Sequence, residues 1–168
     1  ETYANCTTFV FKEPGSKEYL EFVFYKDRND GEELRLFLET NPFIVGFNCL
    51  GFDAQVIEYV FSRGVYKAED VYELAQNIIK ADRFDVPFKP WKLSHKYIDL
   101  YKVKHYDNVA RMTSLKWLEF STRSKKLKDL PYDHTQKITP NQLADVLRDN
   151  RNDVDETEKL WKLCEDEV

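Results

Sequence analysis

The order of its predicted elements places the 168-residue chain in the α/β class, as a single domain spanning residues 1–168. Residues 7–11 and 19–25 alternate apolar and β-favouring side chains around a Pro14-Gly15 turn, which indicates a β-hairpin. Residues 32–40 then have apolar positions at helical spacing. A short apolar strand and a second helix follow, so strands and helices are interspersed as in an α/β domain.

The later elements follow from similar patterns. Residues 43–47 predict a buried strand and residues 52–61 a helix. Residues 68–81 predict a further helix, and residues 96–100 a short strand. Between them, residues 83–92 contain two prolines and predict a loop or an edge segment.

A long C-terminal helix is predicted to begin at Thr139-Pro140, after a capped helix at residues 114–120 and a polar loop at residues 121–138. Its expected core stripe comprises Leu143, Val146, Leu147, Val154, Leu160, Trp161 and Leu163. Three acidic residues of this helix are expected to be solvated, namely Asp155, Glu156 and Glu158.

Composition excludes several classes of protein. The three cysteines are an odd number without metal-ligand spacing, which argues against a disulfide framework or a zinc site and favours a reducing, intracellular (cytoplasmic) compartment. The sequence has neither an apolar run long enough to cross a bilayer nor a secretory leader, so we expect no membrane association.

Charge is unevenly distributed along the chain. Although the net charge is −5, residues 89–128 carry 11 basic and 3 acidic residues, while residues 139–168 carry 9 acidic and 4 basic residues. Acids that hold cations and bases that hold phosphates are the pairing that a nuclease needs. A solvated lysine-rich surface explains the same basic stretch without function.

Two acidic positions are candidates for cation binding. Asn48 and Asp53 lie at a corner after the apolar strand, where a carboxylate can bind a divalent ion, although Asp53 can equally cap the following helix. Asp153 lies beside Val154, near the border of the C-terminal core stripe, and is otherwise one more surface acid.

Three short segments together resemble the motifs of DEDD-type 3′–5′ exonucleases, and most closely the proofreading domains of protein-primed bacteriophage family B DNA polymerases. The segments are Glu1-Thr2, Asn48 with Phe52-Asp53, and Asn152-Asp153-Val154 with Thr157. The first family motif is Asp-x-Glu-Thr, so Glu1 would be its glutamate, and its aspartate would lie two residues earlier, outside this chain. Ser114-Leu115-Lys116-Trp117-Leu118 is similar to a family motif that contacts single-stranded DNA.

The resemblance implies a ribonuclease H-like exonuclease fold with a mixed central β-sheet flanked by helices. It implies that Glu1, Asp53 and Asp153 bind two Mg²⁺ or Mn²⁺ ions, which activate water and neutralise the leaving 3′ oxygen. Lys128 would contact the scissile phosphate as the family's catalytic lysine, with Lys126 as the alternative. The residues implied to contact DNA are Thr2, Asn48, Phe52, Ser114, Leu115, Lys116 and Lys126.

The activity implied is hydrolysis of single-stranded DNA from its 3′ end, as proofreading for a covalently linked polymerase domain absent from this chain. The sequence departs from the family where a water-orienting Tyr or His is usual, because those positions hold Asp149 and Arg148. Tyr132 and His134 could approach the site, although an exposed surface role is expected for His134. The alternative is a degenerate, non-catalytic module that binds single-stranded nucleic acid or a partner protein, and an RNA-directed or standalone exonuclease also stays open.

Overall fold

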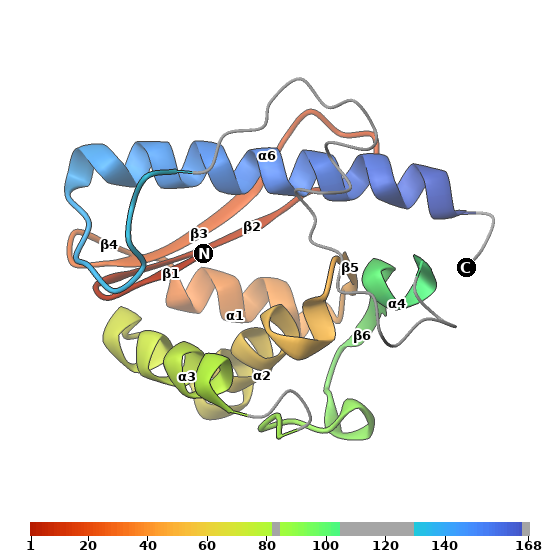
Figure 1. Cartoon of the computed structure of the whole chain (residues 1–168), viewed down its shortest axis with the longest axis horizontal. Helices are drawn as coiled ribbons and strands as arrows, with labels where there is room; N and C mark the ends of the chain where they lie inside the picture. Colours follow the sequence, from red (N-terminus) through yellow and green to blue (C-terminus); the bar gives the residue numbers. More distant parts are fainter. Residues whose placement is uncertain (82–84, 105–129, 166–168) are drawn as a thin grey trace.

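A computed structural model describes residues 1–81, 85–104 and 130–165, and these form an α/β structure with two sheets (Figure 1). One sheet has four antiparallel strands in the order β1-β2-β3-β4, and the other pairs β5 with β6 in parallel. The predicted α/β class is therefore confirmed. The described strands form two separate sheets, where a single mixed central sheet was expected.

The larger sheet is built on the predicted hairpin. Its strands are β1 (Thr2–Tyr3), β2 (Cys6–Phe11), β3 (Leu20–Tyr25) and β4 (Arg28–Asn29). The predicted strands at residues 7–11 and 19–25 correspond to β2 and β3, which pair antiparallel from Thr7 opposite Phe24 to Phe11 opposite Leu20. The short β4 had no signal in the sequence.

Both faces of this sheet are buried. Phe9, Phe22 and Phe24 point to one face and share a core with helices α1 (Gly31–Glu39), α2 (Asp53–Arg63) and α3 (Ala68–Lys80). Cys6 and Val23 point to the other face and pack against the long helix α6 (Pro140–Cys164). The alternation follows from the two-residue period of a strand, and Figure 1 shows α6 on the side of the sheet opposite α1–α3.

The smaller sheet carries the predicted corner. Strand β5 (Phe43–Gly46) leads into the short helix η1 (Cys49–Gly51) and then into α2. After α3 and the short helix η2 (Pro90–Lys92), the chain returns as β6 (Lys96–Asp99), parallel to β5, and continues into α4 (Leu100–Lys104). The predicted strands and helices in this region are confirmed, with shifts of at most two residues at their ends.

Helix α6 packs against both sheets. It begins as predicted, because Thr139 accepts a hydrogen bond from the backbone N–H of Gln142 and the Gln142 side chain bonds back to Thr139, forming a capping box. Its first half buries Val146 and Leu147 against the larger sheet, and its second half buries Leu160 beside β5 and β6. The prediction was wrong for one core residue, since Leu163 is 62% exposed. None of the described helices combines the length and apolar character required to cross a membrane.

Ion pairs fix α6 to the loop between β2 and β3. The ammonium of Lys12 lies 2.8 Å from the Asp155 carboxylate and 2.6 Å from the Glu158 carboxylate. The Tyr19 hydroxyl also donates to Asp155, at 2.8 Å. The expectation that Asp155, Glu156 and Glu158 are solvated was wrong, because the Glu156 and Glu158 side chains are only 11% and 12% exposed and Asp155 is paired.

Candidate metal centre

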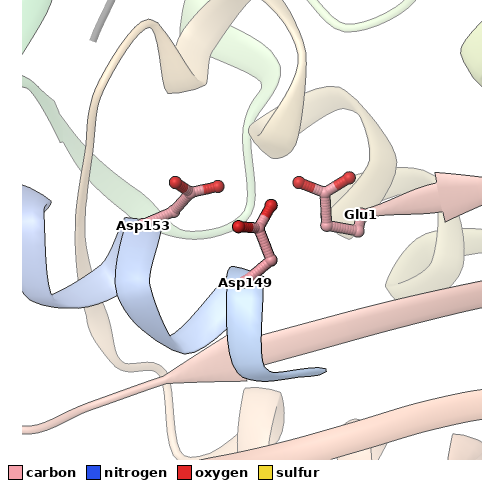
Figure 2. A group of neighbouring side chains, drawn as sticks. All are labelled: Glu1, Asp149 and Asp153. Carbon is pink, nitrogen blue, oxygen red and sulfur yellow. The ribbon is translucent and has the colours of Figure 1, made fainter. Parts of the chain in front are cut away.

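Three carboxylates from the two ends of the chain point toward a common space. Glu1 stands at the start of β1, and Asp149 and Asp153 project from the middle of α6 (Figure 2). One ligand oxygen from each lies within 4.8 Å of the others, and all three residues are partly buried. The structure thus brings together two acids that the sequence predicted, Glu1 and Asp153, and adds Asp149.

Thr8 on β2 links the two elements that carry these acids. The Glu1 backbone is paired with Thr8, through N–H to carbonyl contacts of 3.0 Å and 2.9 Å. The Thr8 hydroxyl accepts a hydrogen bond of 2.9 Å from the side-chain amide of Asn150 on α6. Because Asn150 follows Asp149 directly, this contact fixes the helix acids at the level of Glu1.

The three carboxylates favour a cation by their charge and chemistry. Asp149 and Asp153 are four residues apart on one helix, so they share a face and repel each other when both are ionised. Glu1 adds a third negative charge within 4.8 Å of them. Carboxylate oxygens are the ligands that Mg²⁺ and Mn²⁺ prefer, so the donor set fits such an ion and would be relieved of repulsion by it.

The Asn48–Asp53 corner has an unusual backbone. Asn48 has a φ of 52°, in the left-handed region that Asn tolerates better than most residues. The backbone N–H of Leu50 donates to the carboxylate of Asp99, at 3.1 Å, so the end of β6 holds the corner in place. Asn48 and Asp53 are exposed and Phe52 is half-buried. The cap position of α2 is Phe52, and Asp53 is the first residue inside the helix, so Asp53 is not the capping residue.

Asp53 lies outside the group of three acids, but it is electrostatically coupled to Glu1. Enclosure by protein raises the pKa of the Asp53 carboxyl to about 6; the amino group of residue 1 opposes this shift, and the charges of Glu1 and Asp99 add to it. The residue is nevertheless exposed, so water offsets part of the cost of ionising it. A cation near Asp53 and Glu1 would favour the ionised form.

Two acidic residues of this region were missed as ligand candidates. Asp149 was interpreted only as a departure from a family motif, although its four-residue spacing from Asp153 predicts a shared helix face. Asp99 is the last residue of β6, where its carboxylate accepts a hydrogen bond from the Asn48–Asp53 corner, and it is 6% exposed. Of the remaining predicted residues, Thr2 is buried in β1.

The predicted DNA-contacting and phosphate-contacting residues of the chain's second half lie outside the described residues. These are Ser114, Leu115, Lys116, Lys126 and Lys128. Most of the basic stretch at residues 89–128 and the helix predicted at residues 114–120 lie there too. The structure therefore describes the acidic residues of the predicted site together with Thr2, Asn48 and Phe52.

Comparison with known proteins gave no match of this chain to a family model, to a curated protein or to a solved structure. The assignment of function therefore depends on the chemistry of the residues described above.

Proposed function

We propose that this chain is a ribonuclease H-like, metal-dependent 3′–5′ exonuclease that hydrolyses single-stranded DNA from its 3′ end. The observation that supports this most is the meeting of Glu1 and Asp153, which are far apart in the sequence and belong to different motifs of the resemblance. The Asn48–Asp53 corner lies within electrostatic reach of Glu1. Glu1, the Asn48–Asp53 corner and Asp153 represent the three motifs of the resemblance, and phosphodiester hydrolysis by bound metal ions requires their carboxylates at one place.

The acidic residues and Asn48 would have different roles in this reaction. Glu1, Asp149 and Asp153, with Asp53, would hold Mg²⁺ or Mn²⁺, which when bound lowers the pKa of water and offsets negative charge on phosphate oxygens. A water gives up one proton as its oxygen attacks the phosphorus of the last phosphodiester, the bond from that phosphorus to the 3′ oxygen of the preceding nucleotide breaks, and this oxygen takes a proton. The product is a nucleoside 5′-monophosphate. Asn48, exposed at the corner, is available to orient the terminal nucleotide.

The same proposal extends to the partners of the chain. A 3′–5′ exonuclease that takes one frayed strand suits proofreading, so we propose that the chain acts beside an intracellular DNA polymerase domain joined to it. The basic residues of the stretch 89–128 would hold the phosphates of the incoming strand, because each lysine or arginine contact with a phosphate adds affinity that salt weakens.

The test is a single-stranded DNA degradation assay with Mg²⁺ or Mn²⁺. The chain is compared with a version preceded by two added residues, the first of them Asp, which supplies the remaining carboxylate of the family motif. On 5′-labelled DNA we expect a ladder that shortens from the 3′ end, and on 3′-labelled DNA an immediate release of mononucleotide. Asp53→Ala should abolish both, whereas Glu156→Gln, on the same helix as Asp153, should not. Release of no mononucleotide by the lengthened chain, or full activity of Asp53→Ala, would refute the catalytic proposal.

A second candidate function is favoured by Asp149, which stands where the family carries a water-orienting tyrosine. The chain would then bind single-stranded nucleic acid without cutting it. Binding that persists in EDTA, together with cleavage that appears only in Asp149→Tyr, would support this candidate. Cleavage by the lengthened chain without that substitution would exclude it.

A further inference from the structure

The loop before α6 docks onto the hairpin that carries Glu1. The Asn5 side chain bonds both the N–H and the carbonyl of Ile138, at 2.8 Å and 3.0 Å, and the Tyr25 hydroxyl reaches the same carbonyl at 3.2 Å. His134, in the same loop, stacks on the ring of Tyr3 with centroids 4.5 Å apart and planes 13° apart. The loop therefore contacts the β1–β2 hairpin at two separate points.

His134 satisfies a carbonyl that the sheet leaves unpaired. Glu1 and Thr8 form a hydrogen-bonded pair, so the next pair along the ladder, Thr2 with Thr7, is of the non-hydrogen-bonded kind. The carbonyl of Thr2 consequently points away from β2. Nδ1 of His134 lies 2.9 Å from it, and because a carbonyl can only accept, Nδ1 carries the proton and donates.

The same nitrogen lies close to the carboxylate of Glu1. Nδ1 of His134 is 3.8 Å from Oε2 of Glu1, and the Glu1 side chain is 23% exposed. The backbone bond to Thr2, the ring stacked on Tyr3 and this polar contact to Glu1 therefore act on three consecutive residues, namely the two residues of β1 and the one that precedes them. The expectation of a surface role for His134 holds only in part, since its side chain is 55% exposed but is bound on one face and at one nitrogen.

We propose that His134 is a positioning residue that fixes the carboxylate of Glu1 in the metal centre. The inference rests on the proposed function of that centre. Within the described residues, the backbone of Glu1 is paired with Thr8, and the hydrogen bond from His134 holds the neighbouring Thr2 carbonyl, which does not face β2. Partners of this kind, outside the ligands themselves, typically change metal affinity 10-fold to 100-fold when removed.

The proposal is tested by the affinity of the full chain for Mn²⁺, measured by electron paramagnetic resonance or calorimetry. We expect His134→Ala to weaken Mn²⁺ binding about 10-fold. His134→Asn retains an N–H donor close to the position of Nδ1 and should stay within about threefold of the unaltered chain, because it restores the bond to Thr2. Hydrogen exchange at the Thr8 amide, which donates to the Glu1 carbonyl, should accelerate in His134→Ala only.

A matched control separates positioning from general stability. Tyr132→Phe removes a hydrogen bond of 2.7 Å to Asp145 from the same loop, so it should lower the free energy of unfolding without weakening Mn²⁺ binding. The positioning role alone would be refuted if the unaltered chain binds Mn²⁺ tightly and His134→Ala leaves this affinity unchanged. It would also be refuted if Tyr132→Phe weakens Mn²⁺ binding as much as His134→Ala does. Failure of the unaltered chain to bind Mn²⁺ would refute the proposed function and the role of His134 with it.

Discussion

Replacing Asp53 with Asn should stabilise the chain at neutral pH in the absence of divalent ions. The Asp53 carboxyl has a pKa of about 6 in the folded chain, against an ordinary value of 3.8, so its ionised form is disfavoured by folding. A difference of this size corresponds to at most about 3 kcal/mol. Because the residue is exposed, solvent screening reduces the expected effect to roughly 1 kcal/mol.

The sign of the pH dependence follows from proton linkage. Between pH 3.8 and about 6 the folded chain binds more protons at Asp53 than the unfolded chain, so its contribution lowers stability as pH rises through that window. The advantage of Asp53→Asn should therefore be absent near pH 4 and complete above pH 6. Mg²⁺ or Mn²⁺ should reverse the order, because only the unaltered chain gains the carboxylate as a ligand.

Urea denaturation at pH 4.5, 6 and 8, with EDTA or with Mn²⁺, measures both effects. The free energy of unfolding of the unaltered chain should fall relative to that of Asp53→Asn as pH rises in EDTA, and should exceed it in Mn²⁺. A constant difference between the two proteins across this pH range would refute the environment assigned to Asp53. An equal gain of both proteins in Mn²⁺ would show that Asp53 is not a ligand.

Two further substitutions test the framework around the site. Lys12→Met removes the ammonium that holds the pKa of Glu158 at about 2, so it should lower the free energy of unfolding by about 1 kcal/mol above pH 4.5. This loss should shrink as pH falls toward 2, because Glu158 then becomes protonated. A loss that does not depend on pH would contradict this reasoning. Glu58→Gln should lower the free energy of unfolding by about 3 kcal/mol in urea denaturation, because Glu58 is 1% exposed and accepts hydrogen bonds from both the backbone and the ring of His95. A loss below about 1 kcal/mol would mean that the buried Glu58–His95 pair is dispensable.

Local patterns predicted most elements of this fold. Helices α1, α2, α3 and α6 were predicted to within a few residues, because apolar spacing and end signals such as Thr139-Pro140 act within a few residues of each other. The β2–β3 hairpin was also predicted, from the alternation of apolar and β-favouring residues along its strands and from its turn residues. The division of the strands into two sheets was not predicted, because strand pairing depends on contacts between segments that are distant in the sequence.

The acidic residues of α6 illustrate the same limit. Their roles depend on which element packs against each turn of the helix, and Glu1 and Lys12 lie more than 130 residues away in the sequence. Asp155 and Glu158 turn toward Lys12, whereas Asp149 and Asp153 turn toward Glu1. A helical pattern ranks these residues by polarity alone, so it could not separate acids that pair with a lysine from acids that form a cation site.

The most direct measurement of the central claim is the Mn²⁺ affinity of the unaltered chain, of Asp153→Asn and of Glu156→Gln. Glu156 lies on the same helix and pairs with Lys159, and it is not one of the three acids of the group. We expect the unaltered chain and Glu156→Gln to bind Mn²⁺ with similar affinity, and Asp153→Asn to bind at least about tenfold more weakly, or about 1.4 kcal/mol. Equal affinities of all three proteins would contradict the metal centre and the nuclease function built on it.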